Sequence, residues 1–415
     1  MNRCKLSRSM LPVVALVAVA LPGPGIAADA EPGWLADARA REGKLIEAKP
    51  FRSKDGALTG RVPAKLRNRV GLEDGAYYLE LDVGAESPVS CEVLLEGFDL
   101  ARMLRSTAGL TFDRLAEAQG KIDLKAVERT DAGAFGANPY IAVDWAYRTQ
   151  TAGGPMLGGL KQVVVDMHTY GVYCSHVELG YAKTFAELVR TLAESLQLKG
   201  TAAAPAYVEV QTLKLGEQPV GVATWTLEAD AEGDLRSLLS NSMIVSAGDG
   251  AVTAQDSTHL QWMTPEGALL NAMHVMSSND ETPTKLELRP AEESGVWQVS
   301  GTFMGKTLAL DVGKEPPVSV LAQARARRDL LAGPDPVGKH LTDHSWTAAD
   351  PTRLLASTFK VTGKDGSGRY TAVETSGPLS IDELMDAATG TPLRMTTAIG
   401  PRSLQLERVY VHGTF

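Results

Sequence analysis

The string Ser357-Thr358-Phe359-Lys360 has the spacing S-x-x-K, in which a lysine one helical turn beyond a serine activates that serine as a nucleophile. The chemistry requires both residues on one face of a helix. The residues that follow, Val361-Thr362-Gly363-Lys364-Asp365-Gly366, are instead typical of a strand that enters a hairpin. In a strand, Ser357 and Lys360 point to opposite faces. We therefore interpret the string as a chance match, and we predict no catalytic residue from it.

Two groups of side chains have ligand types that bind metal ions. His340 and His344 have i, i+4 spacing with Asp343 between them, but the segment lacks an HExxH glutamate and a third clear ligand. A run of alternating carboxylates lacks the glutamate at position 12 of an EF-hand. The sequence therefore predicts no metal site and favours solvated loops in both places. The alternating carboxylates are Glu228, Asp230, Glu232 and Asp234.

Other catalytic patterns are missing from the sequence. It contains no G-x-S-x-G elbow, P-loop or G-x-G-x-x-G fingerprint, so it predicts no cofactor. His176 lies two residues after Cys174, but that spacing does not guarantee that the two side chains touch. Trp145 and Tyr147 share one strand face, which is typical of core packing.

The N-terminus has the features of an export signal. Basic residues in the first eight positions precede an apolar run at 11–21 and then small residues, so residues 1–27 are predicted to be a cleaved signal peptide. Eleven apolar residues are too few to span a bilayer, which needs roughly 20. The sequence therefore predicts a periplasmic or secreted protein without a membrane span.

Charge and cysteine content further limit the classes of protein to which the chain can belong. The chain of 415 residues has 41 basic and 50 acidic side chains, for a net charge of −9. Removal of residues 1–27 takes away three basic and no acidic groups, which leaves 38 against 50 and a net charge of −12. Such acidity excludes a nucleic-acid binder. The same removal takes away Cys4 and leaves two cysteines, Cys91 and Cys174. They are predicted to form one disulfide in an oxidising compartment, and the alternatives are two free buried thiols or a metal-binding pair.

Residues 31–199 have the pattern of an α/β domain. Alternating apolar residues predict strands at 75–83 and 90–95, with more strands at 139–149, 160–168 and 171–179. Helices are predicted at 99–119 and in a segment that begins with a capping box of Thr184 and Glu187. The small, uncharged residues that end in Pro205 predict a linker at 200–206.

Residues 207–415 are predicted to be mainly β. Strands are indicated at 207–215, 220–229, 285–288 and 296–312, and a meander follows a single helix that runs from Pro317 to about Ala332. Together the two parts predict an α+β protein with two domains: an antiparallel sheet with packed helices, then a mainly antiparallel β domain. Residues 79–90 and 308–319 are identical at nine of twelve positions, which leaves open whether a unit was duplicated.

The first part resembles a known family. Phe51, Asp55-Gly56 and Val62-Pro63 precede a strand that runs into Tyr181 and the helix at Thr184-Phe185. This layout is similar to the PsbP-like family of small exported α/β/α domains with a central antiparallel sheet. The resemblance implies a non-catalytic binding or assembly role, and it carries over no functional residue.

We therefore expect a non-enzymatic exported protein that binds a macromolecular partner or a small ligand in the cell envelope. One version is an inhibitor or immunity-type protein whose acidic surface meets a basic patch on its partner. The alternative is a periplasmic hydrolase whose site is assembled from residues far apart in the sequence. The sequence leaves the ligand, the partner and the oligomeric state open.

Overall fold

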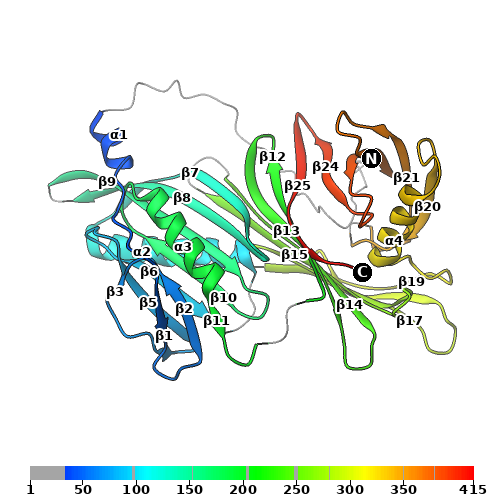
Figure 1. Cartoon of the computed structure of the whole chain (residues 1–415), viewed down its shortest axis with the longest axis horizontal. Coiled ribbons are helices and arrows are strands. Elements are labelled where there is room, and N and C mark those ends of the chain that lie inside the picture. The colour runs from blue at the N-terminus through cyan, green and yellow to red at the C-terminus, as the bar shows by residue number, and fades with distance from the viewer. Residues whose placement is uncertain are drawn as a thin grey trace, which may run out of the picture.

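The computed structural model describes residues 33–95, 99–151, 153–201, 205–246, 251–279, 281–348, 350–377 and 379–415. The predicted signal peptide at 1–27 lies outside these residues. Strands of antiparallel sheets make up most of the described chain, and few helices accompany them (Figure 1). The prediction of an α+β fold is therefore wrong, and the protein belongs to the mainly β class.

The first part of the chain forms two antiparallel sheets. A small sheet has the order β1-β2-β11, and an eight-stranded sheet has the order β3-β5-β6-β10-β9-β8-β7, with β4 paired to β5. The strands of the small sheet are β1 (Lys49–Arg52), β2 (Leu58–Val62) and β11 (Gln197–Leu198). Those of the larger sheet are β3 (Lys65–Leu66), β4 (Leu72–Glu73), β5 (Ala76–Asp82), β6 (Val89–Leu94), β7 (Ile122–Phe135), β8 (Asn138–Thr151), β9 (Gly154–Asp166) and β10 (Gly171–His176).

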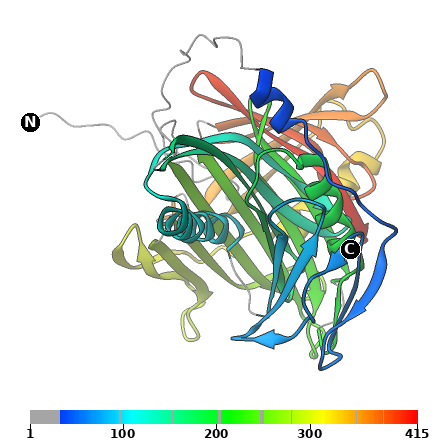
Figure 2. The ribbon, with the colours of Figure 1, turned by 90° about the vertical axis from the view of Figure 1, so that its left-hand side faces the viewer.

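Two helices cover opposite faces of the eight-stranded sheet. Alternation along β9 separates the faces: Val163 and Val165 pack with helix α3 (Ala182–Ser195), while Val164 packs with helix α2 (Leu100–Gln119). Figure 2 shows the two helices on either side of the strands. A short helix, α1 (Gly33–Arg39), precedes the sheets.

The second part forms one antiparallel sheet of 14 strands. Its order is β19-β18-β17-β16-β15-β14-β13-β12-β25-β24-β23-β22-β21-β20, so each half follows the chain and the halves join where β12 pairs with β25. The first half contains β12 (Tyr207–Leu215), β13 (Gln218–Ala229), β14 (Leu235–Ser246), β15 (Val252–Met263), β16 (Leu269–Ser278), β17 (Glu281–Pro290), β18 (Trp297–Phe303) and β19 (Lys306–Gly313). The second contains β20 (His340–Ser345), β21 (Leu355–Lys364), β22 (Tyr370–Ser376), β23 (Leu379–Met385), β24 (Pro392–Ile399) and β25 (Arg402–Gly413).

Helix α4 (Val320–Ala332) joins the two halves and packs against both of them. Leu321 packs in a cluster with Leu286 of β17, and Leu331 packs with Phe359 of β21. One helix can touch both halves because the sheet curls around it (Figure 1). The helix begins three residues after the predicted start at Pro317 and ends at Ala332, as predicted. The hydroxyl of Ser319, which precedes it, accepts a hydrogen bond from the N–H of Ala322 at 3.1 Å.

The strands that the sequence did not reveal explain the error in fold class. β14, β15 and β16 bury many polar side chains, so the inward positions do not alternate as apolar residues. β7, at 14 residues, buries few of its N-terminal side chains, so it too lacks the apolar alternation by which a strand is predicted. The buried polar residues of β14–β16 are Ser237, Ser242, Gln255, Asp256, His259, Gln261, His274 and Ser277.

The predicted linker coincides with the change from one set of sheets to the next. β11 ends at Leu198 and β12 begins at Tyr207. The two parts nevertheless share a hydrophobic cluster, in which Leu104 and Phe112 of α2 pack with Ile244 of β14. The division into domains at 31–199 and 207–415 stays a prediction.

The N-terminus of α3 differs from the predicted capping box. The helix begins at Ala182, so Thr184 lies inside it, and the side chain of Tyr181 makes no cap. The carboxylate of Glu42 instead accepts hydrogen bonds from the N–H groups of Lys183 at 3.1 Å and Thr184 at 2.8 Å. Glu42, which lies 141 positions before Lys183 in the sequence, therefore caps this helix.

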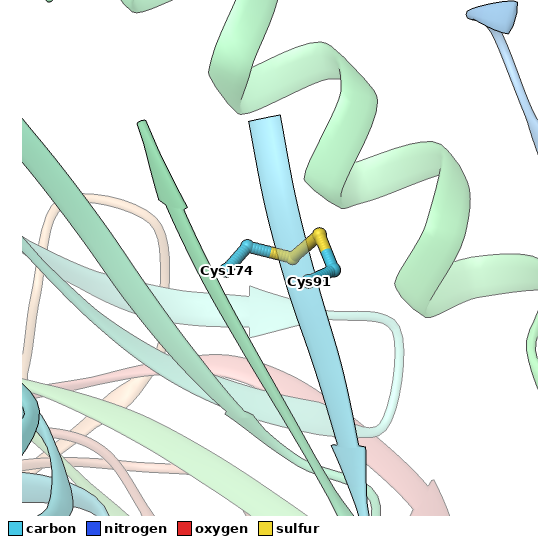
Figure 3. Close-up of a disulfide and its surroundings, with 2 residues drawn as sticks. All are labelled: Cys91 and Cys174. Atoms are coloured by element: carbon cyan, nitrogen blue, oxygen red, sulfur yellow. A yellow bond between two sulfur atoms is a disulfide. The ribbon is translucent and has the colours of Figure 1, made fainter. Parts of the chain in front are cut away.

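The predicted disulfide between Cys91 and Cys174 is confirmed. The two residues are direct partners on the neighbouring strands β6 and β10, with their Cα atoms 4.1 Å apart (Figure 3). Both belong to the cluster on the α3 face of the sheet. The bond joins residues 83 positions apart.

The two similar segments occupy different structures. Residues 79–90 run from β5 into strand β6, whereas residues 308–319 run from β19 to the start of helix α4. β5 has a strand on each side, and β19 is an end strand of its sheet.

Candidate functional site

A cavity of about 160 Å³ lies inside the curl of the 14-stranded sheet. Residues of β12–β15, of β22–β25 and of α4 line it, so every part of the wall comes from the second half of the chain. A space of this volume suits a ring-sized molecule, since a 150 Å³ engineered cavity binds benzene. The apolar part of the wall consists chiefly of Trp225, Leu239, Ile381, Met395 and Leu406.

Arg327 of α4 projects two nitrogens toward carboxylates on two strands. Its Nη2 lies 2.8 Å from Oε2 of Glu374 on β22, and its Nη1 lies 3.6 Å from Oε1 of Glu383 on β23. The guanidinium also lies over the ring of Phe359, 4.7 Å from the centroid. The hydroxyl of Ser357 donates to the other oxygen of Glu374 at 2.6 Å. Burial alone would raise the pKa of Glu374, but Arg327 and this hydroxyl lower it below its usual value.

Glu383 is the least satisfied charged group of the cavity wall. Its side chain is 0% exposed, and as a carboxylate neither oxygen receives a hydrogen bond within the described part of the chain. Burial, with repulsion from Glu374, raises its pKa to about 8, although Arg327 opposes the rise. A protonated Glu383 can donate its O–H to Glu374. At neutral pH the group is therefore held neutral by a proton.

In contrast to Glu383, a second carboxylate of the cavity wall, Glu209 of β12, accepts several hydrogen bonds. Its oxygens accept hydrogen bonds from the hydroxyl of Tyr207 at 2.5 Å, the amide of Gln211 at 2.7 Å and the hydroxyl of Thr391 at 2.9 Å. Arg408 adds a cation at 3.6 Å. Glu209 thus has its full set of partners, and it serves as a satisfied structural anion.

Arg408 is likewise occupied. Its Nη2 donates to Oδ2 of Asp386 at 2.5 Å, and its Nη1 reaches the hydroxyls of Thr389 and Thr391 at 3.4 Å and 3.2 Å. The guanidinium therefore has little capacity left for a ligand.

His259 of β15 lines the same cavity as a neutral donor. The N–H of Val320 donates to Oε1 of Gln261, which turns the Gln261 amide nitrogen toward Nε2 of His259 at 2.9 Å. Nε2 must then accept, so the ring hydrogen lies on Nδ1, and that atom has no partner among the described residues. Burial, with His274 nearby, lowers the pKa of His259 to about 3. His259 therefore carries a buried N–H that no described residue accepts.

Sequence reasoning missed the three charged residues of this cluster, although a signal was present. In β22 the buried positions are Ala372, Glu374 and Ser376, and in β23 Ile381, Glu383 and Met385. A glutamate on the apolar face of an alternating strand is the pattern that marks each one. Arg327 could not be found this way, because its partners lie on other elements.

Ser357 and Lys360 lie on strand β21, with Ser357 buried and Lys360 exposed on the other face. The strand excludes the S-x-x-K geometry, as predicted. Ser357 does take part in the site, as the hydrogen-bond donor to Glu374.

The groups considered as metal ligands are separate in space. His340, Asp343 and His344 lie on strand β20, where Gln323 donates to Asp343 at 3.0 Å and Nδ1 of His344 is 3.6 Å from Glu315. The alternating carboxylates lie where β13 turns into β14. In the part of the chain that the structure describes, no three His, Cys, Asp or Glu side chains are grouped to hold a metal ion.

The remaining candidates belong to the core of the first part. Trp145 and Tyr147 pack edge-on against Phe112, with centroids 5.4 Å and 5.8 Å from it. Cys174 is in the disulfide and so is not a free thiol. Burial, aided by the charge of Lys161, lowers the pKa of His176 to about 4.

No protein-family model matches the chain, and no curated protein sequence matches it. Among solved structures, the chain is similar to a β-barrel-like protein of the domain of unknown function DUF1849 from Brucella abortus. That match has a TM-score of 0.37 and 14% identity, and it covers 51% of this chain and 98% of the other. The resemblance of the first part to PsbP-like domains stays a prediction. Across the described residues, no helix has the length and apolar character needed to cross a bilayer.

Proposed function

We propose that this protein is an exported binding protein of the cell envelope that holds a small ligand in the cavity of its 14-stranded sheet. The observation that carries the proposal is Glu383, a fully buried carboxyl that lines the cavity and receives no hydrogen bond as a carboxylate. Protonated Glu383 can donate to Glu374, but its other oxygen still has no donor among the described residues. Buried polar groups are almost always paired, so an unpaired oxygen in a cavity wall favours an occupant that pairs with it. Apolar side chains opposite would hold the rest of the ligand.

The pairing of the side chains around the cavity favours binding over catalysis. The hydroxyl of Ser357 donates to a carboxylate and not to an imidazole. His259, with its pKa lowered to about 3, is a poor proton acceptor at neutral pH. Neither group has the pairing of an activated nucleophile with a base.

The proposal can be tested by a substitution that fills the cavity with a larger apolar side chain and leaves its charged residues unchanged. Ala324 of α4 is buried and lines the cavity, and Ala332 is exposed at the end of the same helix. We expect Ala324→Leu to weaken binding of small amphiphilic compounds at least tenfold, while Ala332→Leu binds like the wild type. Binding is measured by calorimetry and by ligand-dependent thermal stabilisation. Equal affinity of the two variants for every compound that binds would refute the proposal.

A further inference from the structure

The charges around the cavity are unbalanced. Arg327 faces three carboxyl groups, since Asp343 of β20 acts on it electrostatically in addition to Glu374 and Glu383. Asp343 is held by Gln323 at 3.0 Å, and burial raises its pKa. One guanidinium cannot neutralise three carboxylates in a buried setting, where an unpaired charge is strongly unfavourable, so a proton keeps Glu383 neutral in the free protein.

The other charged groups near the cavity do not supply the missing cation. Arg408 is occupied by Glu209 and Asp386. His259 and His274 are buried, and burial lowers the pKa of each, so neither carries charge at neutral pH. Glu383 can therefore ionise only if a cation from outside the protein takes the place of its proton.

We propose that the cavity selects a small ligand with an ammonium group, which binds Glu383 as an ion pair and places its apolar body against Trp225 and Leu239. The inference rests on the proposed function of the cavity. In the free protein a proton on Glu383 donates to Glu374, but the other oxygen of Glu383 has no donor among the described residues. An ammonium has several N–H donors, so it can replace that proton and satisfy both oxygens of Glu383.

The exchange has a defined proton balance. The protonated carboxyl of Glu383 and the ligand cation combine to give a carboxylate–ammonium pair, and the displaced proton goes to the solvent. Binding at neutral pH therefore releases close to one proton for each ligand bound. A neutral ligand that hydrogen-bonds to the protonated acid releases none.

Benzylamine, benzyl alcohol and benzoate test the inference, because they share a ring and differ in the charge of one substituent. We expect the affinity for benzylamine to exceed that for benzyl alcohol at least tenfold, and benzoate not to bind. Calorimetry in buffers of different ionisation enthalpy should show one proton released with benzylamine only. Glu383→Gln should abolish the release and lower benzylamine affinity at least tenfold. The control Glu407→Gln, on a half-exposed side chain paired with Lys214, should bind like the wild type.

The outcomes separate the two proposals. Equal binding of benzylamine and benzyl alcohol without proton release would overturn the ammonium inference and leave the cavity function standing. No binding of any of the three, together with no effect of Ala324→Leu on any ligand found, would count against the cavity function itself. If Glu383→Gln does not fold, the wild type alone decides: benzylamine affinity should rise close to tenfold from pH 6 to pH 7, because fewer protons compete.

Discussion

Asp256 on β15 accepts a hydrogen bond from the backbone N–H of Ala101 in α2, across 155 positions of sequence, at 3.1 Å. Its other oxygen accepts from the N–H of Arg102 at 2.9 Å. Asp99, which precedes the helix, makes no side-chain cap. A buried carboxylate of the second part of the chain therefore caps a helix of the first part, at the place where the two parts share a hydrophobic cluster.

Replacement of this cap should destabilise the protein. Asp256→Ala leaves two N–H groups at the helix start without an acceptor, so we expect the free energy of unfolding to fall by about 1–2 kcal/mol. Asp99→Ala is the matched control, because that side chain lies at the same helix terminus without capping it, and its effect should stay within about 0.5 kcal/mol. Urea unfolding of both variants measures the difference. Equal losses would show that the contact with Asp256 does not stabilise the helix.

The titration of Asp256 predicts a pH dependence. Burial raises its pKa to about 6, against hydrogen bonds from Ser242 and the helix that lower it. Between about pH 4 and pH 6 the folded state then binds more protons than the unfolded state, so this group's contribution to stability falls as pH rises. Asp256→Asn removes the ionisation. The stability of the wild type relative to this variant should fall by up to about 3 kcal/mol from pH 4 to pH 7. A constant difference would contradict the raised pKa.

Buried imidazoles predict the opposite slope. Burial lowers the pKa of His274 to about 4, whereas an unfolded histidine titrates near 6.5. Below pH 6.5 the unfolded state therefore binds a proton at His274 that the folded state does not bind. Stability is lost as pH falls from 6.5 to about 4. His274→Gln should reduce this acid sensitivity by about 3 kcal/mol over that range. The comparison is made by denaturant unfolding at each pH, and parallel curves for variant and wild type would count against it.

The disulfide should contribute substantially to stability. Cys91 and Cys174 close a loop of 83 positions, and the chain-entropy model assigns such a crosslink about 4 kcal/mol. The double variant Cys91→Ala with Cys174→Ala should lose close to that free energy of unfolding. Peptide mass spectrometry of the non-reduced wild type should recover the two cysteines linked. Two alkylatable thiols in the purified protein would show that the bond does not form.

Some features of this protein follow from its sequence alone. The cysteine count predicts the disulfide, and apolar alternation predicts β5, with Leu79 and Leu81 buried as expected. The helix predicted from Pro317 to about Ala332 corresponds to α4. These signals are local, because strand alternation and the start and stop residues of a helix depend on residues a few positions apart.

Only the tertiary structure decided the fold class, the helix caps and the cavity. The sequence does not predict β14–β16, because the curled sheet buries polar side chains such as His259 and Asp256, and these interrupt the apolar alternation. Glu42 and Asp256 cap helices more than 140 positions away, and Glu42 does so in place of the predicted cap, Thr184. Glu383 and Arg327 meet only because a helix lies inside the curl of the sheet. Contacts between residues so far apart depend on how the chain packs, and no local pattern of side chains records them.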